Sequence, residues 1–457
     1  MNVPALLLVA FLLIPPCISP GQPNANTKGP GALESVTLGE ASPGEPVIGG
    51  DGKNLAVAWL DQPPNGDWVF YRHSSDDGRT FGPPQRMAHG SGGLRAFSAD
   101  GFMHVCWENV AGTELGLDER IFYANIDLNS GRAASPLQVS HELIHEPDRR
   151  GMLLNECSVS SSGDLVLVAW QEGPAYTIHR LFGTVSVDRG KTFSIPIEIA
   201  TVPGGAFTTI ATSPSAAYVA WSSEADSSSR TSNLFFAALD PASKRPPEPE
   251  LLSGTGSECC PDVEVSANKV LVASGGVTIR RSDDGGRTFQ SPLTFEKATD
   301  SAYSHSFMWP KTVLLGSDSY SIFEGIGQDI GPCQQVYFSR VEDGAASLSQ
   351  PLKLSTDTRY ASRPHLFAFP RKLVAVWEET SCHLTSAETG VYVLIRVSED
   401  RGRTFGGAIE VPVNAKDDGA FGLSSVFADS EAVFCAWQEP QVEFDEKLVR
   451  FLRIPLK

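Results

Sequence analysis

The chain has 457 residues, of which 41% are hydrophobic and 20% are charged, so it can bury a substantial core. Its 36 basic and 54 acidic residues give a formal net charge of −18. Such a charge repels phosphate backbones and anionic lipid headgroups, which excludes nucleic acid as an expected partner. The 42 glycines and 32 prolines indicate many turns.

The N-terminal segment has the composition of an export signal. Residues 1–20 carry no charged side chain, and Ala5–Ile14 reads ALLLVAFLLI. This run is too short to span a bilayer but fits a signal-peptide core. We predict a signal peptide over residues 1–20 with cleavage between Ser19 and Thr27, a linker over 21–32, and a secreted or periplasmic protein. No Lys or Arg precedes the run, which leaves a wrongly assigned start codon or an unusual signal as alternatives. Prolines before Cys17 argue against a lipid anchor there, and no later segment predicts a transmembrane span.

Two patterns recur along the rest of the chain. The motif SxDxGxTF begins at Ser74, Ser186, Ser282 and Ser398, at spacings about twice the roughly 40 to 50 residues of a propeller blade. A run closed by Trp and an acid or amide occurs as LAVAWLD, MHVCWEN, LVLVAWQE, YVAWSSE, KLVAVWEE and VFCAWQE. KVLVASGG and SYSIFEGI hold the same place without Trp. These runs indicate eight repeated units.

Each unit continues with further strand-like runs. Seven units have a third run after the Trp strand and its partner, as in PLQVS, PLTFE and PLKLS. The eighth unit ends at Lys457 before this run, while LESVTLGE, from Leu33, resembles it at the other end of the chain. We therefore predict that the N-terminal strand completes the last sheet and leaves no open edge. The predicted fold is an all-β, eight-bladed β-propeller over residues 33–457, with seven blades as the alternative if a Trp-less unit is an insertion.

The SxDxGxTF motif has the composition of a tight turn. Its Asp can accept backbone hydrogen bonds, its Gly supplies a positive φ, and its Phe can pack between sheets. A calcium loop would need three closely spaced acids and a closing Glu, which are absent. We predict a structural role for Ser74, Asp76, Gly78, Phe81, Ser186, Asp188, Gly190, Phe193, Ser282, Asp284, Gly286, Phe289, Ser398, Asp400, Gly402 and Phe405.

Four copies of SxDxGxTF, each between two strand-like runs, closely resemble the Asp-box, or BNR repeat, of the sialidase superfamily. The resemblance implies a sialidase-like propeller but no single activity, because such propellers include sialidases, other glycoside hydrolases and proteins without known catalysis. Sialidases are similar in using three arginines, a Tyr and Glu pair, an Asp and an N-terminal FRIP or YRIP. This chain has no such motif near residue 40, and we interpret its only RIP, Arg453–Pro455, as chance. Sialidase domains also resemble six-bladed rings.

The strand nearest a propeller axis and the loop before it usually form the pocket rim. In this chain these segments contain arginines that could converge on an anionic sugar. The catalytic candidates are Arg95, Arg150, Arg363, Asp262 and Tyr303; Arg149, Arg359, Tyr360, Glu146, Asp148 and Glu156 lie in the same segments.

The same segments also hold cysteines and histidines. Thiolates and imidazoles together suit copper or zinc. In an exported protein we favour oxidation, either Cys259 to Cys260 or Cys157 to one of them, with free thiols as the third possibility. We predict no cofactor, with copper or zinc left open. The histidines are His89, His141, His145, His305 and His365, and the predicted axial binding residues are Glu156, Cys157, Cys259, Cys260, Asp262, His305, Arg363 and His365.

The remaining cysteines and the tryptophans favour structural roles. Cys333 and Cys382 occupy matching loops of successive units, which predicts a disulfide between them. Cys106 and Cys435 lie inside predicted strands and are expected to be inert core thiols. The regular recurrence of Trp favours packing between blades over carbohydrate stacking.

Our leading hypothesis is an exported, sialidase-like propeller that binds a glycan or protein ligand on its axial face, with catalysis not established. One alternative is a glycoside hydrolase or related carbohydrate-active enzyme that uses an acid pair. The other is a metal-binding or redox propeller centred on Cys157, Cys259 and Cys260.

Overall fold

The computed structural model describes residues 35–41, 45–61, 66–113, 116–140, 152–174, 178–203, 206–224, 232–243, 245–254, 258–295, 306–326, 333–356, 358–382, 390–413, 425–440 and 447–456. The chain divides into two units, Met1–Glu34 and Ser35–Lys457, and the second is described below. The predicted signal peptide, the linker and Cys17 lie outside the described residues. In the described ranges no helix has the length and apolar character needed to cross a membrane.

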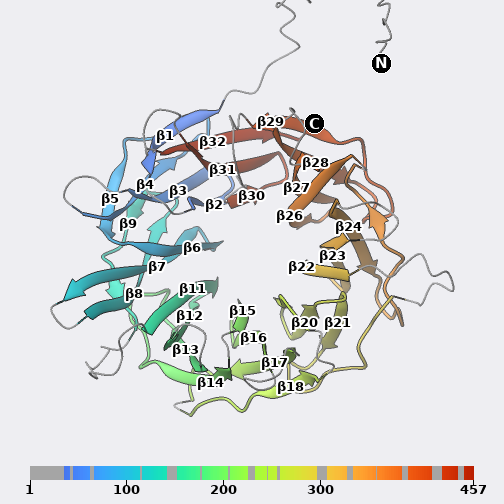
Figure 1. The fold of residues 1–457 in the computed structure, drawn as a ribbon, viewed down its shortest axis with the longest axis horizontal. Helices are drawn as coiled ribbons and strands as arrows, with labels where there is room; N and C mark the ends of the chain where they lie inside the picture. Colours follow the sequence, from blue (N-terminus) through green and yellow to red (C-terminus); the bar gives the residue numbers. More distant parts are fainter. Residues whose placement is uncertain are drawn as a thin grey trace, which may run out of the picture. The chain divides into compact units, whose positions relative to one another are not determined.

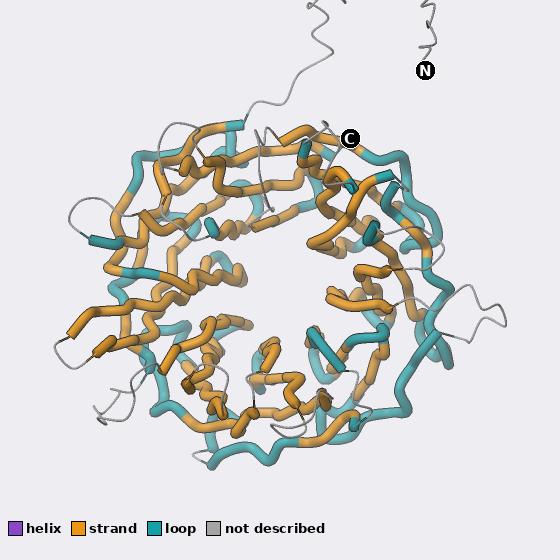
Figure 2. Tube along the Cα trace, viewed as in Figure 1, coloured by secondary structure: helices purple, strands orange, loops and turns teal. Residues whose placement is uncertain are grey.

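Eight antiparallel sheets, arranged in a ring, form the second unit, and Figure 2 shows strands in every one of them. Blade 1 consists of β2 (Val47–Asp51), β3 (Asn54–Asp61), β4 (Trp68–Ser74) and β5 (Gln85–His89), and blade 2 of β6 (Gly92–Ala99), β7 (Phe102–Thr113), β8 (Gly116–Asp127), β9 (Arg132–Ala133) and β10 (Leu137–Gln138). Blade 3 consists of β11 (Met152–Ser162), β12 (Leu165–Pro174), β13 (Ile178–Ser186) and β14 (Ile197–Pro203), and blade 4 of β15 (Ala206–Thr212), β16 (Ala217–Glu224), β17 (Ser232–Leu239) and β18 (Glu250–Ser253).

The second half of the ring repeats this order. Blade 5 consists of β19 (Asp262–Ser266), β20 (Lys269–Ser274) and β21 (Thr278–Ser282), and blade 6 of β22 (Ser306–Leu315), β23 (Asp318–Ile326), β24 (Gln335–Val341) and β25 (Leu352–Lys353). Blade 7 consists of β26 (Arg359–Phe369), β27 (Lys372–Ser381), β28 (Val391–Ser398) and β29 (Ile409–Val413), and blade 8 of β30 (Ser425–Ala428), β31 (Ala432–Pro440), β32 (Lys447–Pro455) and the N-terminal strand β1 (Val36–Ala41).

The N-terminal strand closes the ring. β1 pairs antiparallel with β32, so that Val36 lies opposite Phe451 and Ala41 lies opposite Lys447. The prediction of eight blades with this closure is confirmed, and KVLVASGG and SYSIFEGI form β20 and β23. A sheet that ends on the first strand of the chain leaves no blade incomplete at the join.

One predicted strand was wrong. PLTFE was expected to be the fourth strand of blade 5, but that blade has three strands, and the segment makes only isolated bridges. Leu293 pairs with Ile279 of its own blade, whereas Phe295 pairs with Leu348 of blade 6. Because the chain crosses to the next blade within two residues, no continuous ladder forms.

The core of the ring lies between the blades. Eight clusters of buried apolar residues each join two neighbouring blades, so every interface has its own core. Burying a large aromatic side chain removes about 150–250 Å² from water, which makes the tryptophans large contributors. The prediction that they pack between blades is confirmed, because Trp59, Trp107, Trp170, Trp221, Trp377 and Trp437 are all buried.

The four SxDxGxTF turns have one hydrogen-bond pattern. In the first, Asp76 Oδ1 accepts from the Ser74 hydroxyl at 2.8 Å and from the Thr80 N–H at 2.8 Å, while Asp76 Oδ2 accepts from the Thr80 hydroxyl at 2.6 Å. Ser74 Oγ accepts from the Gly78 N–H at 3.0 Å. The same four bonds occur in the turns that begin at Ser186, Ser282 and Ser398. Each turn therefore satisfies its own polar groups locally.

The Phe of each turn packs edge-on against an aromatic ring of the preceding blade. The ring centroids are 4.8 to 5.0 Å apart in the pairs Phe81–Phe451, Phe193–Tyr123 and Phe289–Phe236, and 4.9 Å apart in Phe405–Phe338. The turns lie in blades 1, 3, 5 and 7, and the partners lie in blades 8, 2, 4 and 6. The double spacing of the motif thus reflects blades joined in pairs.

The turns define one face of the ring, which we call the turn face. Ser398, which opens the fourth turn, pairs with Leu373 near the start of β27. Arg359, at the start of β26, pairs with Ser381 at the end of β27. The first residues of the innermost strands therefore lie at the opposite end of the blade, which we call the mouth face.

Two disulfides each connect a pair of blades that the Phe of an SxDxGxTF turn also connects. Cys106 of blade 2 is bonded to Cys157 of blade 3, with Cα atoms 6.2 Å apart, and Cys333 of blade 6 is bonded to Cys382 of blade 7, with Cα atoms 5.6 Å apart. Both separations fall in the ordinary disulfide range. Blade pairs 2–3 and 6–7 are thus linked by an aromatic contact and by a covalent bond.

Candidate functional site

The first strand of each blade lies nearest the axis of the ring, as Figure 1 shows for β2, β6, β11, β15, β22, β26 and β30. Of the first strands, β6, β11, β15, β19, β22, β26 and β30 line a cavity of about 390 Å³, which we call the axial channel. Its volume falls within the range of small-molecule pockets. The wall includes the polar residues Ser160, Thr212, Asp262, Glu264, Lys311 and His365, together with Phe97 and Phe367.

An ion pair joins blades 5 and 6 in the channel wall. Lys311 Nζ lies 3.1 Å from Asp262 Oδ1, and the Thr312 N–H donates to Asp262 Oδ2 at 2.7 Å. Both carboxylate oxygens of Asp262 are therefore occupied. This arrangement places the predicted candidate Asp262 in a structural ion pair that faces the channel.

Two titratable groups of the channel are neutral near pH 7. Burial lowers the pKa of His365 to about 4, and the charges of Lys311 and Arg363 lower it further. Burial and the neighbouring Asp262 raise the pKa of Glu264 to about 8, although part of its surface stays exposed. With Asp262 and Lys311 paired, the wall offers hydrogen-bond donors and acceptors with little net charge.

Three consecutive blades carry the same irregularity where the channel opens on the mouth face. The sequences Cys260-Pro-Asp, Trp309-Pro-Lys and Arg363-Pro-His begin with residues at φ 53°, 54° and 53°, in the left-handed region. Such a backbone costs about 1–3 kcal/mol for a non-glycine residue and occurs at functional sites and in tight turns; Asp77, Arg189 and Arg401 of the SxDxGxTF turns have it as well. The third residue of each triplet lines the channel. This signature was not predicted, although the sequence x-Pro-polar recurs in three successive units.

The irregularity bulges the innermost strands. The pairing register shifts between Met308 and Lys311 in β22, and between Ser362 and His365 in β26. In β6 the shift falls between Gly92 and Arg95, and Gly93 has φ 58°. A bulge re-aims the side chains that follow it. Arg95, Lys311 and His365 thus occupy equivalent positions in their blades.

An exposed pair of aromatic rings lies on the mouth face. Trp309 of blade 6 is 45% exposed and Phe207 of blade 4 is 53% exposed, yet their ring centroids are 5.5 Å apart in an edge-to-face arrangement. Blade 5 lies between their blades, so the two side chains meet across it. Large exposed apolar groups that contact each other indicate an interaction surface. We call Trp309 and Phe207 the aromatic pair.

Carboxyl groups gather around Arg363. Glu324 accepts hydrogen bonds from the Arg363 N–H at 2.7 Å and from Gln334 Nε2 at 2.6 Å, and Tyr360 donates to Gln334 Oε1 at 3.2 Å. Arg363 Nη1 lies 3.4 Å from Glu45 Oε1. This group links blades 6 and 7 and includes the predicted residues Arg363 and Tyr360.

Two carboxyls of this group have a raised pKa. Burial raises the pKa of Glu324, against the hydrogen bonds from Arg363 and Gln334. Burial also raises the pKa of Glu378 to about 8; Arg363 opposes this shift, while Glu45 and Glu324 reinforce it. Among the described residues, Glu378 Oε1 has no hydrogen-bond partner. Buried carboxyls with raised pKa beside a cation are candidates for proton transfer.

The predicted arginine triplet is not brought together among the described residues. Arg95 on β6 and Arg363 on β26 come from opposite sides of the opening in Figure 1. Arg359 pairs with Glu410 at 2.9 Å and lies 3.9 Å from the ring centre of Tyr392. Arg453, of the RIP sequence, pairs with Asp77 of the first turn. Outside the described residues lie Arg149, Arg150, Tyr303, Glu146, Asp148, His141, His145, His305 and the side chain of Glu156.

His89 does not belong to the channel wall. It is the last residue of β5, the outermost strand of blade 1, where its ring lies 3.7 Å from that of Trp68. The sequence placed it in the segment before an innermost strand. That strand begins only at Gly92, which leaves His89 in the preceding blade.

The cysteine pairing differs in part from the prediction. Cys157 is bonded to Cys106, so its predicted bond to Cys259 or Cys260 and the predicted free thiol of Cys106 are both wrong. The cause is the ring geometry, because β7 and β11 are in contact whereas Cys259 lies two blades further on. Cys259 and Cys260 are free thiols and do not bridge each other. The Cys333–Cys382 bond is confirmed, and Cys435 is buried and free as expected.

The described residues hold no group of three or more His, Cys, Asp or Glu side chains placed to bind a metal ion. The sulfur of Cys157, the centre of the predicted thiolate cluster, is used in a disulfide. Chemistry at the mouth face must therefore be sought in the aromatic pair, the carboxyls around Arg363 and the channel wall.

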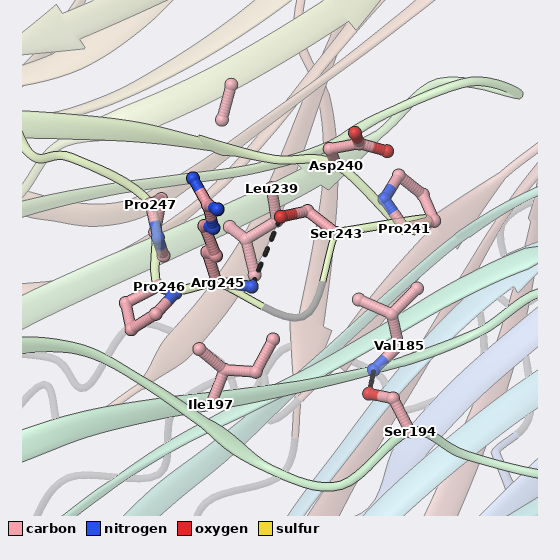
Figure 3. A pocket seen from close by; sticks show the side chains of 11 residues that line it. Val185, Ser194, Ile197, Leu239, Asp240, Pro241, Ser243, Arg245, Pro246 and Pro247 are labelled. Atoms are coloured by element: carbon pink, nitrogen blue, oxygen red, sulfur yellow. Dashed lines mark hydrogen bonds between the residues drawn. The ribbon is translucent and has the colours of Figure 1, made fainter.

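A smaller hollow lies on the outer part of blades 3 and 4 (Figure 3). Its volume is about 100 Å³, below the range of ligand pockets. Within its wall, the Val185 N–H donates a hydrogen bond to Ser194 Oγ and the Arg245 N–H donates one to Ser243 Oγ. The axial channel is the larger of the two by about a factor of four.

The chain is similar to solved β-propellers. The polysaccharide lyase Uly1 matches with a TM-score of 0.50 at 8% identity, over 95% of this chain and 94% of its own. An ulvan lyase bound to -[GlcA(1-4)Rha3S]- matches with a TM-score of 0.50 at 11% identity, over 93% of this chain and 98% of its own. No family model and no curated protein matches the sequence. At these identities the likeness establishes the propeller fold.

Proposed function

We propose that this chain is an exported β-propeller that binds a glycan at the mouth of its axial channel, on the face opposite the SxDxGxTF turns. The observation that carries the proposal is the aromatic pair, Trp309 and Phe207, exposed beside a channel of about 390 Å³. Exposed aromatic faces stack against the C–H faces of sugar rings, and the polar groups beside them hold the hydroxyls.

The charge of the channel indicates which glycans fit. Asp262 and Lys311 neutralise each other, His365 is neutral, and Glu264 is mostly protonated near pH 7. Such a wall binds hydroxyl and acetamido groups without attracting anions. The formal net charge of −18 also opposes polyanionic chains. The proposed ligand is therefore a neutral glycan, although the two lyases of similar fold are described as acting on polysaccharides, in one case one that contains GlcA.

Export belongs to the same proposal. Two disulfides join neighbouring blades, and such bonds persist in oxidising compartments. The apolar segment Ala5–Ile14 would act as the core of a signal peptide that directs export. A glycan ligand is expected to be met outside the cell, where polysaccharides and glycoproteins are displayed.

The test is a glycan array followed by calorimetry on the wild type and on Trp309→Ala. We expect Trp309→Ala to weaken binding by roughly tenfold or more, because stacking on one aromatic side chain contributes about 1–2 kcal/mol. Ile195→Ala, at an 86% exposed residue on the turn face, is the matched control and should bind as the wild type does. Unchanged binding by Trp309→Ala, or binding of a protein but no glycan, would overturn the proposal.

A second candidate function is glycoside hydrolysis by the carboxyls around Arg363. It is favoured by Glu378, which is buried, has a pKa of about 8 and has an oxygen without a described partner. An acid that stays protonated at neutral pH can protonate a leaving oxygen. Glu324 can instead serve only to link neighbouring blades. Its side chain bonds the backbone of Arg363 in the next blade, just as the side chain of Gln171 bonds the backbone of Ala206 in the next blade.

Turnover separates the two functions. In a panel of fluorogenic neutral glycosides and sialosides, the neutral glycosides should be hydrolysed by the wild type. Glu378→Gln should lower this rate at least about 100-fold while glycan binding stays intact. Glu410→Gln, at an exposed carboxylate that pairs with Arg359, is the control. Binding without turnover across the panel excludes the hydrolase and retains the binding protein.

A further inference from the structure

Cys259 and Cys260 stand apart from the other described cysteines. Four of these form disulfides, and Cys435 is buried in the core between blades 7 and 8. Cys259 and Cys260 are free and directly precede β19 on the mouth face. Cys259 is half-buried and Cys260 is buried. Two adjacent thiols thus remain at the site where the proposed ligand would bind.

The two thiols are unequal. The Cys260 thiol donates a hydrogen bond that lowers the pKa of Cys259, against burial and Glu258, and the Trp309 N–H adds to the lowering. The pKa of Cys260 is raised by the same hydrogen bond and by burial. A thiolate is the nucleophile in disulfide exchange, so the more exposed Cys259 attacks first and Cys260 follows.

We propose that Cys259 and Cys260 are a redox-active pair that closes to a disulfide between adjacent residues and thereby displaces Trp309 from the aromatic pair. The side chains of Cys259 and Cys260 are hydrogen-bonded to each other, and Cys260 has a left-handed backbone at φ 53°. The free pair in this structure is the reduced form, in which Trp309 and Phe207 are in contact.

The oxidant is a low-molecular-weight disulfide. The Cys259 thiolate attacks one of its sulfurs, the S–S bond breaks, and one small thiolate leaves and takes up a proton. Cys260 then gives its proton to solvent and attacks the Cys259 sulfur, which releases the second small thiol. Two cysteine thiols are oxidised to one disulfide, and one small disulfide is reduced to two thiols.

The backbone connects this reaction to Trp309. Gly275 N–H donates to the Cys259 carbonyl at 2.9 Å, and Gly276 N–H donates to the Phe307 carbonyl at 2.9 Å. The turn between β20 and β21 therefore bonds both the cysteine segment and β22. A disulfide is about 2.05 Å long, so closure draws the two sulfurs together and shifts the Cys259 backbone. Only the effect on ligand affinity depends on the proposed glycan binding; the oxidation does not.

The test of the chemistry uses the purified full chain, oxidised glutathione, alkylation under denaturing conditions and peptide mass spectrometry. We expect the peptide that contains Cys259 and Cys260 to lose two hydrogens and to keep no glutathione. Cys260→Ser should retain one glutathione on Cys259, Cys259→Ser should retain none, and Cys435→Ser should react as the wild type does. An unreactive native pair in a chain that reacts when denatured, or a Cys259→Ser variant that reacts like the wild type, would overturn the assignment.

The test of the consequence compares the reduced and oxidised forms. Iodide quenching of tryptophan fluorescence should change on oxidation and should not change in Trp309→Phe; identical quenching of both wild-type forms would overturn the displacement of Trp309. A glycan identified on the array should bind the oxidised form at least about threefold more weakly. Equal affinity overturns the regulation alone. If no glycan binds either form, the proposed function fails, while the mass change still reports the cysteine chemistry.

Discussion

The turn face and the mouth face of the ring are built by different rules. On the turn face, four blades repeat one turn. In each copy the Ser and the Thr donate hydrogen bonds to the Asp of that turn, and the Phe contacts the preceding blade. On the mouth face, equivalent positions hold Cys260, Trp309 and Arg363, which share a strained backbone and no chemistry. The repeated turn serves the packing of neighbouring blades, whereas different side chains at equivalent positions of the mouth face indicate where a ligand is expected to bind.

Both faces contain non-glycine residues in the left-handed region, including Asp77, Arg189 and Arg401 in the turns, but Gly402 and Trp309 have different surroundings. Gly402 at φ 75° lies so close to Phe338 that a Cβ atom would overlap that ring, so glycine serves packing there. Trp309 at φ 54° keeps a large exposed side chain, and packing does not explain it. Non-glycine residues in this region cluster at functional sites, which makes Trp309 a candidate for a functional residue. Four experiments test this contrast.

Removing a disulfide should have the largest effect. The Cys106–Cys157 and Cys333–Cys382 bonds close loops of 51 and 49 residues, so each is expected to contribute about 4 kcal/mol through the unfolded chain. The double variant Cys106→Ala with Cys157→Ala should lose more stability than the other pair, because both of its cysteines are fully buried. Denaturant midpoints of the two double variants measure this. A larger loss for Cys333→Ala with Cys382→Ala would contradict it.

Gly402→Ala tests the turn face. Its Cβ would lie 2.5 Å from Phe338, in a backbone that disfavours side chains, so we expect a loss of about 2–3 kcal/mol. Gly407→Ala is the matched control, since nothing lies within 4 Å of its Cβ and its φ is not positive. Thermal unfolding measures stability, and glycan binding of the folded fraction should be unchanged. A Gly402→Ala variant as stable as the Gly407→Ala variant would remove the packing argument.

The two faces should respond to opposite changes in pH. Asp76, Asp188 and Asp400 have pKa values lowered to about 2, chiefly by hydrogen bonds from their turns. A lowered carboxyl pKa stabilises the fold above its unfolded value of about 4, and this stabilisation disappears as the pH falls toward 2. Glu264 in the channel wall and Glu378 on the mouth side, with pKa values of about 8, favour the fold while they are protonated. That contribution is lost as the pH rises.

The measurement separates these groups from the histidines. Burial lowers the pKa of His104 and His365 to about 4, so they reduce stability as the pH falls from about 6.5. Between pH 6.5 and 8 the raised carboxyls therefore dominate, and each should lower stability by roughly 1–2 kcal/mol. Glu378→Gln should flatten this decline in melting temperature, whereas Glu410→Gln should not. Equal slopes for both variants would show that Glu378 is ionised at neutral pH.

The sequence predicted the turn face far better than the mouth face, for a physical reason. The bonds of the SxDxGxTF turn span at most four residues, so the motif itself determines them. Its aromatic partner lies in another blade and leaves no local pattern, so Tyr123 and Phe338 were not anticipated. Likewise, the approach of Cys157 to Cys106 depends on the ring, whereas sequence adjacency favoured Cys259 and Cys260. The contact of Trp309 with Phe207 spans two blades and could come only from the structure.

The smallest effect, with the opposite sign, is expected for Trp309→Gly. Glycine adopts a positive φ without strain, so the variant should be as stable as the wild type or more stable by up to about 1 kcal/mol. The lost contact with Phe207 is exposed and offsets only part of this gain. Glycan binding should fall at least as far as in Trp309→Ala. Gly402→Ala loses stability and keeps binding, whereas Trp309→Gly keeps stability and loses binding. If Trp309→Gly were instead destabilised by several kcal/mol, Trp309 would have a structural role. The distinction between the two faces, which rests on Trp309, would then not hold.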